Sequence, residues 1–285
     1  MAKQYLLGMY EKAVPNDITW EERLTVARES GFDYVEISVD ETDAKLARLD
    51  WTADERRELV RLQQECGLPI RSMCLSGHRK YPFGATDPAV RERSMQIMEK
   101  ALHLACDLGV RTIQLAGYDV YYEDGTDETR KYFAENLARA TEMAAREGVL
   151  LGFETMETPF MDTVEKSMAY VNQVDSPYLG VYPDLGNLTN ASFLYGKSVT
   201  DDLATGRGHL LAAHCKETVA GAYREIPFGT GTTGWKALDE CVKQGVRRYV
   251  AEFWYVGSEN WREETAFASE YVRAKIEAAF ARCGK

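Results

Sequence analysis

Short apolar runs recur along the chain at intervals that suit alternating strands and helices. Each run has the length of a strand and is rich in β-branched, aromatic or aliphatic residues; the runs begin near Tyr5, Tyr34, Ile70, Thr112, Leu150, Leu179, Leu211 and Arg248. Their spacing averages about 35 residues, which is the length of one βα unit in a barrel of roughly 250 residues. The pattern therefore predicts a series of strand–helix units.

Amphipathic segments with glycine stops lie between these runs. We predict helices over residues 20–30, 52–66, 88–108 and 127–147, because each is followed by a glycine that can take the left-handed conformation of a helix C-cap: Gly31, Gly67, Gly109 and Gly148. A further amphipathic helix over residues 262–281 is expected to close the outer ring. This alternation favours a closed (β/α)8 TIM barrel over an open sheet, with residues 1–285 as one α/β domain.

A polar residue stands near the end of each of the last four runs, LLGFETME, LGVYPDLGN, LLAAHCKET and RYVAEFWY: Glu154, Asp184, His214 and Glu252. Active sites of TIM barrels lie at the carboxyl ends of the strands, so these side chains are expected to converge. Strand alternation puts each of them on the inward face and turns Cys215 towards the helices.

Three carboxylates and an imidazole without a thiolate suit manganese, magnesium, cobalt or a zinc ion with open positions. We therefore predict one divalent metal ion held by these four residues. The alternative is that they are unrelated structural charges. It would leave the acids with Lys216 as their one obvious basic partner, and burying an uncompensated carboxylate costs several kcal/mol.

Composition narrows the choice of partners. A net charge of -11 argues against nucleic-acid and anionic-membrane partners, because phosphate surfaces are bound by basic proteins. The first run, LLGMYEK, is not followed by GxGxxG, so nothing favours a nicotinamide or flavin cofactor. No apolar stretch is long enough to span a membrane, and the six scattered cysteines suggest reduced thiols and a cytoplasmic protein.

Several longer stretches resemble one enzyme family. In order along essentially the whole chain they are MYEKAVP, FDYVEISVDETDAKLARLDW, MCLSGHRKYPFG, IQLAGYDVYYE, YPDLGN, HCKET and IPFGTG. They look like the L-ribulose-5-phosphate (L-xylulose-5-phosphate) 3-epimerases of ascorbate and pentose catabolism, a group also labelled hexulose-6-phosphate isomerases. In the wider xylose-isomerase-like superfamily the metal ligands are Glu, Asp, His and Glu on strands five to eight. The resemblance carries these roles onto Glu154, Asp184, His214 and Glu252.

Epimerisation at C3 removes a proton beside a carbonyl and returns it to the other face. A divalent ion stabilises the enediolate as a Lewis acid, and two bases are needed. Glu154 and Glu252, on strands about 135° apart around the barrel, are the expected catalytic bases. The candidates for binding the sugar phosphate are Lys12, Glu36, His78, Arg79, Lys80, Glu157, Lys216 and Arg224. We also expect a homo-oligomer, a dimer.

Other functions of similar barrels remain open at this point. A ketose-phosphate isomerase, a free-ketose 3-epimerase or an inosose dehydratase could use a similar metal site. An apurinic endonuclease needs more histidine and acidic ligands and a basic groove, which four histidines and a charge of -11 do not offer. A sugar-binding barrel without catalysis would not need a carboxylate on each side of the sugar.

Overall fold

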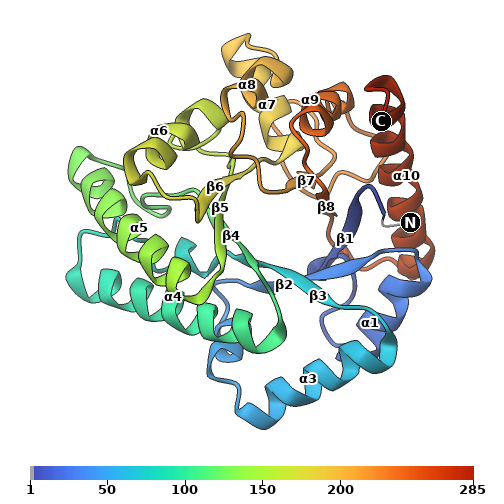
Figure 1. The fold of residues 1–285 in the computed structure, drawn as a ribbon, viewed down its shortest axis with the longest axis horizontal. Helices are drawn as coiled ribbons and strands as arrows, with labels where there is room; N and C mark the ends of the chain where they lie inside the picture. The colour runs from blue at the N-terminus through green and yellow to red at the C-terminus, as the bar shows by residue number, and fades with distance from the viewer. Residues whose placement is uncertain (1–2) are drawn as a thin grey trace.

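The computed structural model describes residues 3–285, and a barrel of parallel strands forms its centre (Figure 1). The strands are β1 (Leu6–Tyr10), β2 (Tyr34–Val39), β3 (Ile70–Leu75), β4 (Thr112–Ala116), β5 (Leu150–Glu154), β6 (Leu179–Tyr182), β7 (Ala213–Cys215) and β8 (Arg248–Ala251). They follow one another in the order β6-β5-β4-β3-β2-β1-β8-β7, with every paired neighbour parallel. The predicted (β/α)8 barrel is thereby confirmed.

The two ends of this strand order, β6 and β7, meet through isolated contacts. Parallel bridges join Val181 to Leu210 and Asp184 to His214. The His214 amide also donates a hydrogen bond to the carbonyl oxygen of Pro183 at 2.9 Å. The barrel is therefore closed at a seam that runs up to the carboxyl ends of the strands.

A ring of helices surrounds the strands (Figure 1). The α-helices are α1 (Trp20–Glu29), α2 (Asp43–Leu46), α3 (Ala53–Cys66), α4 (Pro88–Leu108), α5 (Asp127–Glu147), α6 (Val164–Val174), α7 (Leu185–Tyr195), α8 (Val199–Thr205), α9 (Leu238–Lys243) and α10 (Trp261–Arg282). Short 3-10 turns are η1 (Glu11–Ala13), η2 (Ala47–Asp50), η3 (Gly77–Arg79) and η4 (Trp235–Ala237). The last helix, α10, packs beside β1 and β8 and closes the ring. Among the helices of residues 3–285, none has the length and apolarity needed to cross a membrane.

Local signals explain most of the helix boundaries. The helix α3 begins one residue later than predicted because Thr52 is its N-cap and forms a capping box with Glu55. Gly67, Gly109 and Gly148 are left-handed C-caps, as predicted. Gly31 also has a positive φ of 84°, although it follows the C-cap residue Ser30. The strand β7 begins at Ala213, two residues after the predicted start, because the preceding residues belong to the irregular seam.

Two of the hydrophobic clusters among the described residues lie on opposite sides of the strands. The larger one fills the layer between strands and helices and includes Cys215, as its strand position predicted. The smaller core fills the barrel interior and is made by Tyr10, Tyr34, Cys74, Tyr182, Ala212 and Val250. Gly8 makes room for the Tyr34 ring, since a Cβ at this position would lie 2.4 Å from Tyr34 Cε2. The barrel interior is thus closed by packed side chains beneath the mouth, where the active sites of this fold lie.

Candidate metal centre and sugar cavity

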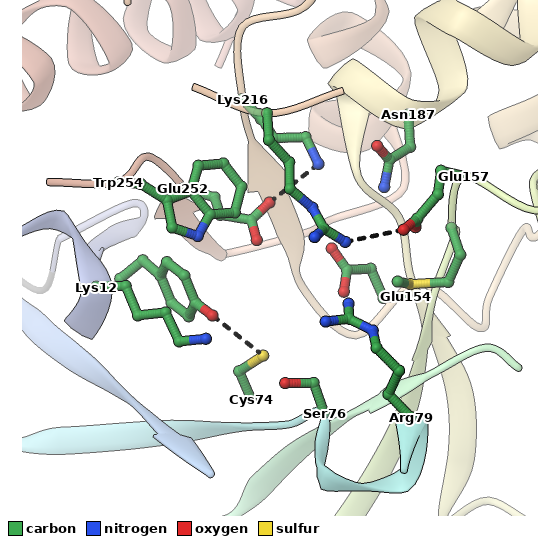
Figure 2. A pocket seen from close by; sticks show the side chains of 13 residues that line it. Lys12, Cys74, Ser76, Arg79, Glu154, Glu157, Asn187, Lys216, Glu252 and Trp254 are labelled. Atoms are coloured by element: carbon green, nitrogen blue, oxygen red, sulfur yellow. Dashed lines mark hydrogen bonds and ion pairs between the residues drawn. The ribbon is translucent and has the colours of Figure 1, made fainter. Parts of the chain in front are cut away.

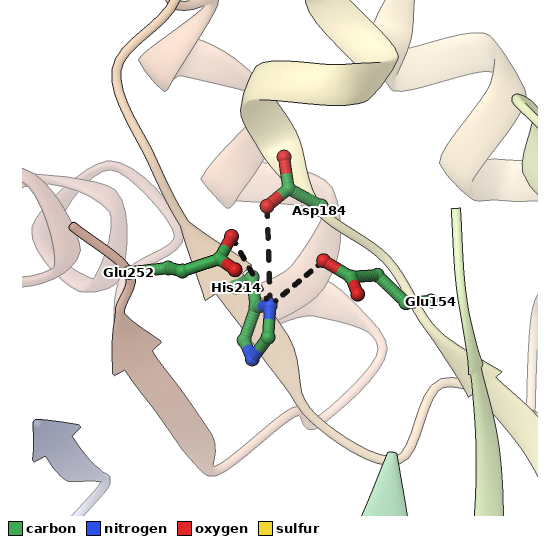
Figure 3. Close-up of side chains that lie close together, drawn as sticks. All are labelled: Glu154, Asp184, His214 and Glu252. Atoms are coloured by element: carbon green, nitrogen blue, oxygen red, sulfur yellow. Dashed lines mark hydrogen bonds and ion pairs between the residues drawn. The ribbon is translucent and has the colours of Figure 1, made fainter. Parts of the chain in front are cut away.

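Four buried polar side chains converge at the carboxyl ends of β5 to β8 (Figure 3). Glu154 is the last residue of β5, and His214 lies within β7. Asp184 is the N-cap of α7, where its Oδ1 accepts a hydrogen bond from the Asn187 amide at 2.6 Å. Glu252 directly follows β8. One donor atom from each of the four lies within 4.8 Å of the others, so the predicted cluster is present.

The imidazole of His214 stands at the focus of this cluster (Figure 3). Its Nδ1 lies 3.0 Å from Glu154 Oε1, 3.4 Å from Glu252 Oε2 and 3.9 Å from Asp184 Oδ2. Its other nitrogen, Nε2, lies 2.6 Å from Glu36 Oε1 on β2. The two ring nitrogens therefore face different partners, and Nδ1 is the one directed at the three acids.

Burial and mutual repulsion set the protonation of these acids. Burial, followed by repulsion from Glu252, raises the pKa of Glu154, and burial raises the pKa of Asp184 well above its usual value. Burial alone would raise the pKa of Glu252 as well, but the charges of Lys216 and His214 hold it well below its usual range. In the absence of a cation, burial therefore favours the protonated forms of Glu154 and Asp184, and the neighbouring positive charges favour the ionised form of Glu252.

The donor set fits a divalent cation. Asp184 Oδ2 and Glu252 Oε2 are buried and accept no hydrogen bond within the described chain. Lys216 lies near both, with its Nζ 3.1 Å from Asp184 Oδ2 and 3.3 Å from Glu252 Oε2, and so offsets one of the negative charges. A small cation about 2 Å from each donor would satisfy the orphaned oxygens and the remaining charge. These residues can therefore hold one metal ion.

A cavity opens directly above the cluster (Figure 2). Its walls are Tyr10, Lys12, Cys74, Ser76, Arg79, Glu154, Met156, Glu157, Asn187, Lys216, Arg224, Glu252 and Trp254. Lys12, Arg79, Glu157 and Lys216, which were predicted to contact substrate, all line this cavity together with Glu154 and Glu252. The sequence-based candidates that follow β1, β3, β5 and β7 thus meet in one place.

An ionic network surrounds the mouth of the cavity. Arg224 Nη2 donates to Glu157 Oε1 at 2.8 Å, and the Tyr118 hydroxyl donates to Glu157 Oε2 at 2.7 Å. The Arg79 guanidinium lies 4.7 Å from the centre of the Tyr121 ring, and its buried Nε has no hydrogen-bond partner in the described chain. Arg79 lies after β3 and Arg224 lies between β7 and β8, and both reach the same opening.

Three of the predicted substrate contacts lie elsewhere. Glu36 is fully buried below the cavity against His214, because it sits mid-strand and not at the strand end. His78 is turned outwards, with Nε2 3.1 Å from the Ser94 carbonyl oxygen and its ring 4.3 Å from that of Phe83. Burial accordingly lowers the pKa of His78 to about 4. Lys80 lines a neighbouring cavity and pairs with Asp43 at 3.8 Å. The geometry speaks against direct sugar contacts for all three.

Among the wall residues that were not predicted as substrate contacts are Cys74, Ser76 and Asn187. Cys74 and Ser76 share the inward face of β3 and its extension, so the alternation used for the four ligands would have found them. Asn187 lies in the first turn of α7, and its Nδ2 donates to the Thr155 carbonyl oxygen at 2.7 Å. Its position depends on the bend between β6 and α7, for which the sequence carries no periodic signal.

The two glutamates of the cluster differ in their support. Gln114 on β4 donates from Nε2 to Glu154 Oε2 at 2.6 Å, so both oxygens of Glu154 are engaged. The Oε2 atom of Glu252 is buried without a hydrogen-bond partner among the described residues and lies 3.3 Å from Lys216 Nζ. Glu154 is thus held more firmly than Glu252.

Comparison with known proteins shows the family to which the chain belongs. The family described as xylose isomerase-like TIM barrel matches residues 24–274. The L-ribulose-5-phosphate 3-epimerase UlaE of Salmonella paratyphi B is 43% identical over 281 residues, which cover 98% of this chain and 98% of that protein. The chain belongs to the L-ribulose-5-phosphate 3-epimerase family. As a member of this epimerase family, it is an isomerase-class enzyme.

Solved structures agree with this family's fold. An L-ribulose 3-epimerase superimposes with a TM-score of 0.76 at 19% identity, covering 98% of this chain and 97% of that one. The D-psicose 3-epimerase of Clostridium cellulolyticum H10, solved with D-tagatose, gives a TM-score of 0.80 at 16% identity over 95% of this chain and 99% of its own. At these identities the likeness supports the barrel architecture of the epimerase family.

Proposed function

We propose that the protein interconverts L-xylulose 5-phosphate and L-ribulose 5-phosphate by epimerisation at C3. The observation that carries the proposal is that one cavity is lined by the two glutamates of the four-residue cluster and by several cationic side chains. The 43% identity to an L-ribulose-5-phosphate 3-epimerase over nearly the full chain supports the same substrate.

In this proposal Glu154, Asp184, His214 and Glu252 hold one divalent ion of magnesium, manganese, cobalt or zinc. When bound, such an ion acts as a Lewis acid that makes the C3 proton of a neighbouring ketose more acidic. The four side chains would hold the ion at the floor of the cavity. Tyr34 and Tyr182 pack in the barrel interior below it and keep bulk water out.

Glu154 and Glu252 would exchange the proton with C3. They come from β5 and β8 and reach the cavity from different sides, which suits removal of the proton on one face and its return on the other. The Lys216 ammonium, whose Nζ lies 3.3 Å from Glu252 Oε2, would favour the ionised form of Glu252 and so suit it to accept the proton. Glu154, which reaches the cavity from the other side, would return a proton to the opposite face of C3.

The phosphate group of the substrate would lie at the mouth. Arg79 and Arg224 both line the opening, and each carries N–H groups in the planar arrangement that matches phosphate oxygens. Lys12 is the third cationic wall residue and pairs with Asp40 at 2.5 Å. Binding energy from a phosphate held here can orient C3 between the two glutamates.

Proton NMR in deuterated water tests the reaction directly. The protein is incubated with L-xylulose 5-phosphate, and the proposal expects deuterium at C3 together with L-ribulose 5-phosphate. Deuterium at C1 or C2 with an aldose product would identify an aldose–ketose isomerase and overturn the proposal. Unphosphorylated L-xylulose, measured in parallel, reports whether the phosphate contributes.

We also infer a homodimer and a cytoplasmic reaction. Phe193, Leu194 and Tyr195 are consecutive exposed apolar residues at the end of α7, which supports a subunit contact. The six cysteines are all free, which supports a reducing compartment. Light scattering coupled to size-exclusion chromatography decides the oligomeric state, and a mass near 32.2 kDa would exclude the dimer.

A further inference from the structure

Beneath the four candidate ligands lies a buried carboxylate that the proposed reaction does not use. Glu36 stands in the middle of β2 with no exposed surface, and the cavity wall does not include it. Isolated buried carboxylates are costly, so a glutamate kept in this place calls for a specific set of partners.

Glu36 has such partners on three other strands. Its Oε2 accepts hydrogen bonds from Ser72 Oγ on β3 at 2.7 Å and from the Tyr182 hydroxyl on β6 at 2.9 Å. Its Oε1 lies 2.6 Å from His214 Nε2 on β7. The two neutral donors fix the carboxylate plane, and the remaining oxygen is thereby aimed at the imidazole.

This contact determines which nitrogen of His214 carries a hydrogen. Glu36 Oε2 already accepts two hydrogen bonds, and its Oε1 is placed as the acceptor 2.6 Å from Nε2, so Nε2 is the donor to Glu36. When the imidazole is neutral, its lone pair then lies on Nδ1, the atom that faces Glu154, Asp184 and Glu252 at 3.0 to 3.9 Å. A histidine ligand needs this orientation to donate its lone pair to a metal ion.

We propose that Glu36 is the positioning residue that makes His214 a metal ligand. It selects the Nε2–H form and holds the ring between Tyr182 and the acids, with the Tyr182 and His214 ring centres 4.9 Å apart. This proposal rests on the metal centre of the proposed function. It adds Glu36 to that centre as a residue that would contact neither the metal ion nor the sugar.

The test is metal affinity and not turnover. Wild-type protein and Glu36→Gln are stripped with chelator and titrated with Co2+ in competition with a chromophoric chelator. Loss of the carboxylate that orients a ligating histidine typically weakens metal binding about 10- to 100-fold, and this is the expected result. Glu240→Gln is the control, because Glu240 is equally a buried glutamate but lies on α9 among Arg207 and Gln244.

Two further readouts separate positioning from a merely structural role. The rise in melting temperature that Co2+ produces should be smaller in Glu36→Gln, whereas a structural role lowers the metal-free and metal-loaded temperatures equally. Nitrogen-15 NMR of the zinc-loaded wild type should show the hydrogen of His214 on Nε2; the chain has four histidines, so its signals can be assigned by elimination.

Each outcome decides the matter. Co2+ affinity of Glu36→Gln within twofold of wild type, with an unchanged thermal shift, overturns the role of Glu36 and leaves the metal centre intact. A wild type that binds no Co2+ overturns the centre and this proposal together. If Glu36→Gln does not fold, Tyr182→Phe removes one donor that aims the carboxylate; a severalfold loss of affinity supports the proposal, and an unchanged affinity overturns it.

Discussion

Lys216 Nζ lies 3.1 Å from Asp184 Oδ2, and both side chains are buried at the edge of the acidic cluster. The ammonium is the one Lys or Arg group within 4 Å of the four candidate ligands in residues 3–285. Lys216 therefore neutralises part of the negative charge of the acids when no metal ion is bound.

Lys216→Met should destabilise the metal-free protein far more than the metal-loaded one. Removing one partner of a buried ion pair costs about 3 kcal/mol, because the remaining charge is left uncompensated, and a bound divalent ion restores the balance. Urea unfolding with chelator and with Mn2+ measures the difference. Lys236→Met, at an exposed position, is the control. Equal destabilisation in both conditions would contradict this role.

Glu154→Gln and Glu252→Gln should each reduce epimerisation about 1,000-fold or more, because each variant lacks one of the two proton-transfer groups. Each should still exchange the C3 hydrogen of one epimer with solvent, and the two variants should act on opposite epimers. Deuterium incorporation followed by NMR measures this, with metal content determined alongside. Near-normal turnover in either variant would show that it does not supply a base.

Arg224→Met should lower kcat/KM for L-xylulose 5-phosphate about 10- to 100-fold, the usual worth of a charged hydrogen bond, and leave that for free L-xylulose nearly unchanged. Lys80→Met is a matched control, since Lys80 is a nearby cation that lines a different cavity. Steady-state kinetics with both sugars provides the measurement. A similar drop for both substrates would assign Arg224 a role in holding Glu157 and not the phosphate.

His78 should make the protein less stable as the pH falls. Burial lowers its pKa to about 4 from an ordinary 6.5, so above pH 6.5 it is neutral in both states and contributes nothing. Between pH 6.5 and 4 the unfolded state takes up a proton that the folded state refuses, and stability is lost. Relative to His78→Gln, the wild type should lose about 2 kcal/mol between pH 7.5 and 5 in urea unfolding. Equal pH slopes for the wild type and His78→Gln would contradict this prediction.

The strand ends were predictable because two independent constraints coincide there. Glu154 and His214 each had to point inwards by alternation and to lie late in a run, and a barrel brings such positions together. Glycine C-caps fixed several helix ends equally well, as at Gly109 and Gly148. Both signals are local, so they can be recognised in the sequence without knowledge of the tertiary structure.

The depth of a residue in the barrel could not be predicted from such local signals. Glu36 points inwards as expected, but Ile37, Ser38 and Val39 continue the strand beyond it, so it lies a layer below the mouth. His78 follows β3 in a 3-10 turn whose direction depends on packing against α4. Strand stagger and loop direction arise from contacts between distant segments, and a single sequence does not express them.

The candidate metal centre lies across the seam between β6 and β7. Asp184 and His214 are bridge partners across this seam, where the described barrel is joined by isolated bridges in place of a continuous ladder. A metal ion bound to both residues would join the two edges of the sheet. Metal binding would then slow local opening of the barrel, and amide exchange at His214 and Leu211 would report that change.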